Sequence, residues 1–87
     1  MKITLRLFSH LRVIAGTREL ALDLPPETNV GGALAALIVC FPDARPVVYY
    51  AGGGLGIRLL LNEADATPGQ QLADGDELAL LPPVGGG

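Results

Sequence analysis

The chain has little of the side-chain chemistry on which most enzymes depend. Its 87 residues include one cysteine, one histidine and no tryptophan. A lone cysteine, Cys40, excludes an intramolecular disulfide, and Cys40 with His10 cannot form a two-histidine or cysteine-rich metal site. A Ser/His/Asp triad would have to use His10, whose surroundings do not resemble a nucleophile elbow. We therefore expect no bound metal and no catalytic side chain.

Basic residues and long apolar runs are scarce as well. Six lysines and arginines stand against nine aspartates and glutamates, and the net charge of −3 opposes binding to nucleic acid. No apolar run approaches the roughly 20 residues that span a bilayer, and the alternating start is unlike a secretory signal. We expect a cytoplasmic protein of one domain, residues 1–87, that binds neither nucleic acid nor membrane.

Two segments near the N-terminus alternate between polar and apolar residues. This period of two over residues 2–8 and 19–24 predicts two strands that each bury one face. Because only about ten residues separate them, an antiparallel hairpin is the simplest pairing. We expect a short helical turn in the connection, with Ser9 as its cap and Gly16 as its stop.

One segment has the spacing of an amphipathic helix. Apolar residues recur at helical intervals from Val30 to Phe41, Thr28 or Asn29 can cap the first turn, and Pro42 ends the helix. The next stretch, 43–56, stays open, since Val47–Tyr50 fits either a strand or a further helix. The residues expected to face the core are Val30, Leu34, Leu37, Ile38 and Phe41.

Two further strands complete the pattern. They are predicted at 57–61 and 77–81, the second after a turn at Asp74-Gly75-Asp76. The order strand, strand, helix, strand, strand predicts an α+β fold in which one mixed sheet is covered by one main helix. Placing the first and last strands side by side in the middle leaves few exposed edges.

The end of the chain is the most informative feature of the sequence for function. We expect residues 82–87 to leave the last strand as an extended tail, because each proline fixes φ near about −65°. A glycine end has no Cβ and can thread a narrow channel. The α-carboxylate of Gly87 could be activated with ATP to an acyl adenylate, after which sulfide or an amine would replace AMP. The alternative is a tail without a function. Its residues are Pro82, Pro83, Val84, Gly85, Gly86 and Gly87.

These features resemble a known family, the small ubiquitin-like sulfur carriers of the MoaD/ThiS type. The nearest type is the small subunit of molybdopterin synthase (MoaD-like). The resemblance implies the β-grasp fold, with a mixed four- to five-stranded sheet packed on one main helix. The matching stretches are Phe8-x-x-Leu11-Arg12-x-x-Ala15-Gly16, Asn62, Asp74-Gly75-Asp76-Glu77 and the ending Leu81 to Gly87.

The resemblance also implies a function. An adenylyltransferase related to ubiquitin-activating enzymes would use ATP to adenylate Gly87, and sulfur transfer would give a C-terminal thiocarboxylate. The large subunit of molybdopterin synthase, in a heterotetramer, would then accept the tail and pass the sulfur to a pyranopterin precursor of the molybdenum cofactor. The chain itself would bind no cofactor, and it would be a non-catalytic carrier subunit of a sulfurtransferase complex.

Some positions depart from the family pattern and leave the pathway open. Gly85 stands where Ser, Thr or Ala is usual, and both the Gly52–Gly54 loop and residues 64–71 are atypical. The alternatives are a carrier for cysteine, tRNA or thiazole sulfuration, a ubiquitin-like modifier joined to lysines, and a plain binding module. The glycines near residue 54 do not form a phosphate loop, since no G-x-G-x-x-G or Lys-Ser/Thr motif is present.

Three side chains are candidates for binding a partner. Phe8 and Leu81 would lie near the base of the tail, and an exposed aromatic residue there can contribute much of a binding energy. The alternative is that both are ordinary core or edge residues. Arg12 could pair with a partner's carboxylate, or it could merely be solvated.

Overall fold

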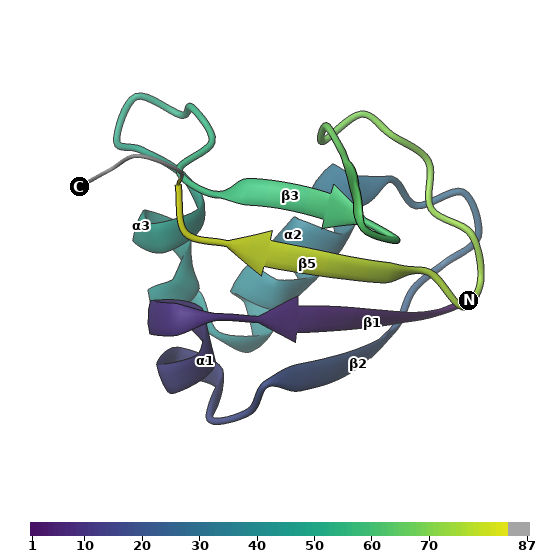
Figure 1. The fold of residues 1–87 in the computed structure, drawn as a ribbon, viewed down its shortest axis with the longest axis horizontal. Helices are drawn as coiled ribbons and strands as arrows, with labels where there is room; N and C mark the ends of the chain where they lie inside the picture. Colours follow the sequence, from purple (N-terminus) through teal and green to yellow (C-terminus); the bar gives the residue numbers. More distant parts are fainter. Residues whose placement is uncertain (84–87) are drawn as a thin grey trace.

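The computed structural model describes residues 1–83, which form a five-stranded sheet with helices on one face (Figure 1). The predictions for Val84, Gly85, Gly86 and Gly87 lie outside the described residues. In chain order the elements are β1 (Lys2–Leu7), α1 (Ser9–Ala15), β2 (Glu19–Asp23), α2 (Val30–Cys40), a 3-10 turn η1 (Pro42–Ala44), α3 (Arg45–Val48), β3 (Arg58–Leu61), β4 (Ala64–Asp65) and β5 (Glu77–Leu81).

The sheet has the strand order β2-β1-β5-β3-β4. β1 and β5 run parallel, and the other neighbouring strands are antiparallel. The first and last long strands therefore lie side by side in the interior of the sheet, as the sequence predicts. This arrangement confirms the α+β, β-grasp fold. The sequence analysis missed β4, which is only two residues long and carries no alternating pattern.

Period-two alternation decides which face of β1 is buried. Ile3, Leu5 and Leu7 are at most 2% exposed and point toward the helices, as predicted. In the second strand segment Leu22 and Leu24 are buried and Leu20 is half-buried. The buried side chains of the sheet pack with those of α2 into one core.

The helix α2 begins where the sequence predicts. Of the two candidate caps, Asn29 is the one used, and its side chain accepts a hydrogen bond of 2.9 Å from the N–H of Gly32. Thr28 instead donates its hydroxyl to the carbonyl of Pro25 at 2.7 Å. A larger residue at Gly32 would clash with its neighbour, because a Cβ there would lie 2.5 Å from a methyl of Thr28.

The predicted cap of α1 is wrong. Ser9 lies inside the helix with a φ of +54°, and the preceding Phe8 takes the cap position without a side-chain hydrogen bond. The predicted stop is confirmed, since Gly16 has a φ of +74° and donates its N–H to the carbonyl of Arg12 at 2.9 Å. Glycine suits this position because a left-handed residue with a Cβ is strained.

The open segment 43–56 combines both alternatives. The chain continues as helix through η1 and α3, and then Tyr49 turns extended and pairs with Leu55 in an isolated bridge. Between them, Tyr50 donates its N–H to the carbonyl of Gly54 at 2.7 Å.

Among residues 1–83, no helix is long and apolar enough to cross a membrane.

Candidate functional site: the base of the tail

The tail leaves from a strand that is held on both sides. Leu80 is paired with Leu7 of β1 and with Leu59 of β3, and Leu81 is paired with Arg58. A strand bonded along both edges has little freedom to swing, so its direction is set up to its last residue. Figure 1 shows β5 ending on the side of the molecule where α1 and α3 lie, away from the N-terminus.

The exit from β5 is surrounded by apolar side chains. Pro82 and Pro83 follow the strand and are exposed. They line a hollow of about 160 Å³, here called the tail-base groove, together with residues from the end of β1, from α1 and from the segment between α3 and β3. The groove is lined by Phe8, Ser9, His10, Leu11, Val47, Gly56, Ile57, Leu80, Leu81, Pro82 and Pro83.

The structure brings the predicted docking residues together at this groove. Because Leu7 pairs with Leu80, the following residues Phe8 and Leu81 lie beside each other where the two strands end. Phe8 remains 37% exposed, and Leu81 is half-buried. Both are therefore available to a partner, and their role in docking stays a prediction.

Sequence reasoning missed two other members of this surface. Leu60 is half-buried on the sheet face turned away from α2, and it is paired with Ala79 of β5. With Phe8 and Leu81 these residues form a surface that we call the docking patch. Leu60 could have been found from the sequence. Alternation in β3 places it on the same face as Arg58, where a polar residue is expected and leucine is an exception.

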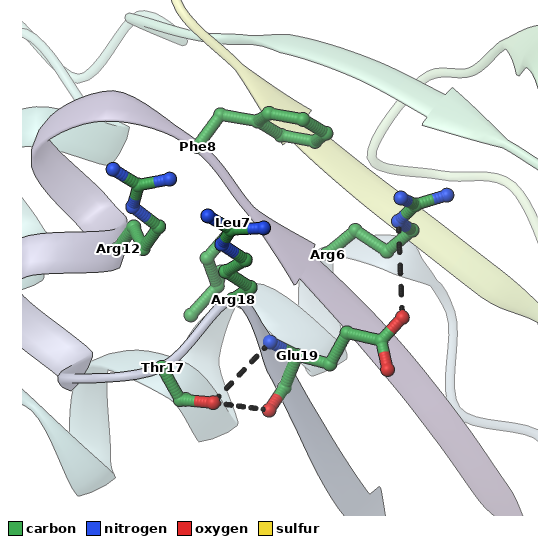
Figure 2. Close-up of a pocket in the computed structure, with 7 residues that line it drawn as sticks. All are labelled: Arg6, Leu7, Phe8, Arg12, Thr17, Arg18 and Glu19. Atoms are coloured by element: carbon green, nitrogen blue, oxygen red, sulfur yellow. Dashed lines mark hydrogen bonds and ion pairs between the residues drawn. The ribbon is translucent and has the colours of Figure 1, made fainter.

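A second hollow lies beside Phe8 and is rich in arginine (Figure 2). Its volume is about 660 Å³, and we call it the arginine pocket. Arg6 lies 3.3 Å from a carboxylate oxygen of Glu77 and 4.0 Å from one of Glu19, and its guanidinium is 5.9 Å from the Phe8 ring centroid. The pocket is lined by Arg6, Leu7, Phe8, Arg12, Thr17, Arg18 and Glu19.

Arg12 lies at the same pocket, so the three predicted partner-binding residues occur at one end of the sheet. Arg18 was missed from the sequence, since five residues separate it from Arg12 without any periodic pattern. It reaches this place because the chain folds back after α1, where the N–H of Leu7 donates to the carbonyl of Arg18 at 2.8 Å. Only the closure of the hairpin brings the two arginines to one pocket.

The polar residues of the turn before β5 stabilise the fold through hydrogen bonds. The side chain of Asn62 donates to a carboxylate oxygen of Asp76 and accepts from the N–H of Glu77, each at 3.0 Å. Asp76 also accepts from the N–H of Ala73 at 2.8 Å, and Asp74 accepts from the N–H of Lys2. These contacts fix the start of β5, which explains the acidic cluster without a metal ion.

Comparison with known proteins agrees with this architecture. A family model described as the ThiS family matches residues 5–87, from β1 through Gly87. The chain belongs to the ThiS family. It is thus a ubiquitin-like member of the sulfur-carrier group that its sequence resembles, and the family match includes the glycine tail.

The relatives of this ThiS-family chain include a protein modifier and a molybdopterin synthase subunit. It is 40% identical to small archaeal modifier protein 1 of Haloferax volcanii, over 94% of this chain and 97% of that protein. It is 30% identical to the molybdopterin synthase sulfur carrier subunit of Arabidopsis thaliana, over 100% of this chain and 84% of that protein. The crystal structure of the Haloferax protein superposes with a TM-score of 0.89 at 38% identity, covering 100% of both chains.

Proposed function

We propose that this protein is a sulfur carrier whose working group is the carboxylate of Gly87, and that it serves as the small subunit of molybdopterin synthase. The observation that supports this most is the exit of β5. A strand fixed on both edges directs the chain through Pro82 and Pro83, next to an exposed docking patch. The carboxylate of Gly87 can then enter the active site of a partner enzyme while the docking patch binds the surface of that enzyme outside the site.

The proposed chemistry takes place on partner enzymes. A carboxylate oxygen of Gly87 attacks the α-phosphorus of ATP, which forms an acyl adenylate and releases pyrophosphate. Sulfide then adds to the acyl carbon, AMP leaves with the electron pair of the broken C–O bond, and a thiocarboxylate remains. This chain supplies no catalytic side chain and binds no cofactor, because ATP is bound by the adenylyltransferase. Use of ATP also fits a cytoplasmic location.

We propose that one surface serves both partners. The docking patch binds first the adenylyltransferase related to ubiquitin-activating enzymes and later the large subunit of the synthase, in a heterotetramer. A patch made of Phe8, Leu60, Ala79 and Leu81 can be covered by only one of them at a time. The charged carrier must therefore leave the first partner before it reaches the second.

The Haloferax relative supports a second candidate function. Its name is that of a protein modifier, and its identity of 40% is higher than the 30% of the Arabidopsis subunit. The two functions share the adenylate and differ in the nucleophile, since a lysine amine in place of sulfur gives an isopeptide bond. Carriers for cysteine, tRNA or thiazole sulfuration use the same thiocarboxylate and are further uses of this chemistry.

A reconstitution separates these candidates. The thiocarboxylated protein is mixed with the large subunit and the pyranopterin precursor, and molybdopterin is measured as its fluorescent oxidation product. We expect product only with the thiocarboxylate form and not with the free carboxylate. Failure to form product, together with lysine conjugates of the protein in cell extracts, would replace the carrier function by the modifier function.

A further inference from the structure

The arginine pocket has a charge that the rest of the molecule does not share. Three of the six basic residues of the chain line it, against one glutamate, although the net charge of the protein is −3. Like charges that line one hollow repel one another unless an anion lies between them. The pocket is therefore a local basic site on an acidic protein.

The three arginines are not equivalent. Arg6 is paired with Glu77 and Glu19. Within residues 1–83, neither Arg12 nor Arg18 forms an ion pair. Both are exposed, and Figure 2 shows their guanidinium groups extending toward the Phe8 side of the pocket, away from Thr17. Two positive charges that have no carboxylate partner within the described residues therefore line the same pocket as Phe8. The Phe8 ring is also part of the docking patch.

These two arginines contribute little to stability, since Arg12 lies exposed in the last turn of the short helix α1, where a cation is only weakly stabilising, and Arg18 is exposed as well. An exposed charge contributes little to folding, and the carbonyl of Arg18, rather than its side chain, makes the contact to Leu7. Their planar guanidinium groups are suited to carboxylates, which they can bind through two parallel N–H···O bonds.

We propose that the arginine pocket receives a short acidic peptide segment of the partner proteins that charge or use Gly87. This inference rests on the proposed function and names the chemistry of the partner surface. Carboxylates of the segment pair with Arg12 and Arg18, and an apolar side chain beside them packs on Phe8. Because Phe8 also borders the tail-base groove, the segment fixes the orientation of the domain next to the tail's exit.

The charge balance favours a peptide over nucleic acid. A long nucleic acid would extend beyond the pocket and be repelled by the negative charge of the rest of the protein. A short acidic peptide contacts only the basic site. The volume of about 660 Å³ lies within the range of roughly 300–1,000 Å³ of sites for drug-sized molecules, so it accommodates several side chains rather than a single ion. Opposite charges also speed the encounter of the two proteins.

The first test does not depend on any activity of the tail. The ¹⁵N-labelled protein is titrated with a short synthetic peptide of glutamate and leucine, with the same peptide carrying lysine in place of glutamate, and with inorganic phosphate. We expect the acidic peptide alone to shift the signals of residues 6–19, including the Nε–H groups of Arg12 and Arg18. Arg12→Glu combined with Arg18→Glu abolishes these shifts. The matched control is Lys2→Glu, a charge reversal at the other end of β1, and it preserves them.

Two outcomes of this titration would overturn the proposal. One is a set of shifts that lies outside the pocket or survives the double charge reversal. The other is an equal response to phosphate, which would make the pocket a small-anion site. Thermal unfolding of each variant verifies that the fold is kept, since all three changed side chains are on the surface.

The second test uses the adenylyltransferase encoded by the same genome. With the double charge reversal we expect the KM for this protein to rise about tenfold, with an unchanged kcat and a weaker dependence on salt. An unchanged KM would contradict the inference while leaving the proposed function intact. If no variant is adenylated, including the unchanged protein, the proposed function fails, and the peptide titration still decides on the pocket.

Discussion

At the scale of single residues, Phe8 occupies a place where alternation in β1 calls for a polar side chain. Its predecessors on that face are Lys2, Thr4 and Arg6, and its ring stays 37% exposed. The exposed part of such a ring gains free energy of burial only when a partner covers it. The same residue borders both the tail-base groove and the arginine pocket.

We expect Phe8→Ala to weaken binding of the adenylyltransferase by about tenfold or more, because a buried aromatic anchor is typically worth upward of 1 kcal/mol at an interface. The free energy of unfolding falls by about 1–2 kcal/mol, since the side chain is 37% exposed and the rest of it is covered in the free protein. Isothermal titration and urea unfolding measure the two effects. Val39→Ala is the control, because Val39 is 80% exposed on α2. Equal binding by both variants would remove Phe8 from the docking patch.

Asn62 illustrates a residue that serves the fold. It has a φ of +49° and makes two side-chain hydrogen bonds to the residues that begin β5. We expect Asn62→Gly, which tolerates the positive φ, to lower the free energy of unfolding by about 1–2 kcal/mol through loss of these bonds. Adenylation of Gly87 at saturating enzyme remains unchanged. A variant that unfolds normally but is no longer adenylated would assign Asn62 to the partner interface.

At the scale of elements, α2 depends on its first turn. Gly31 and Gly32 are poor helix formers, at about 1 kcal/mol each relative to alanine, so the Asn29 cap and the buried apolar stripe hold the helix. We expect Asn29→Ala to cost about 1 kcal/mol of stability. Asn29→Asp keeps the acceptor oxygen and is nearly neutral. Urea unfolding of both variants measures this, and equal losses would show that the cap bond contributes nothing.

The long elements could be predicted because their patterns are strong and local. Alternation in β1 and helical spacing in α2 each specify one buried face, and few sheet orders bury all those faces at once. The cap of α1 could not be predicted, because serine favours caps on average, whereas here Ser9 has a φ of +54° and Phe8 takes the cap position. Segment 43–56 lacks a period, and its path depends on contacts such as the N–H of Gly56 with the carbonyl of Val48 at 2.7 Å.

Some residues of the candidate site could likewise be predicted from the sequence, and others could not. Phe8, Leu81 and Arg12 could be chosen from the sequence, since they break an alternation or stand in a family motif. Leu60 also breaks an alternation, but neither Leu60 nor Arg18 could be placed beside the others, because their proximity arises from strand pairing and from the return of the chain after α1. Sequence patterns assign a face to a residue, whereas only the folded topology tells which faces meet.

At the scale of the whole molecule, the fold separates stability from the proposed activity. The described core extends from Ile3 to Leu80, and the group that we propose as the working one is seven residues beyond it in sequence. Deleting Gly85–Gly87, which removes every glycine of the chain's end, should therefore abolish charging and change the unfolding midpoint by no more than measurement error. Circular dichroism on heating measures the midpoint, and a large loss of stability would show that the end of the chain is structural.

Intact-mass spectrometry tests the central claim most directly. The protein is incubated with its adenylyltransferase, ATP and a sulfide source, under conditions that convert a known ThiS-family carrier, and the variant lacking Gly85–Gly87, which ends in Val84 and has no glycine terminus, is treated in parallel. We predict a mass increase that matches the replacement of one oxygen by sulfur, located at Gly87, and no change in the variant. An unaltered mass of the full chain, or the same increase in the variant, would contradict a carrier that works through its terminal carboxylate.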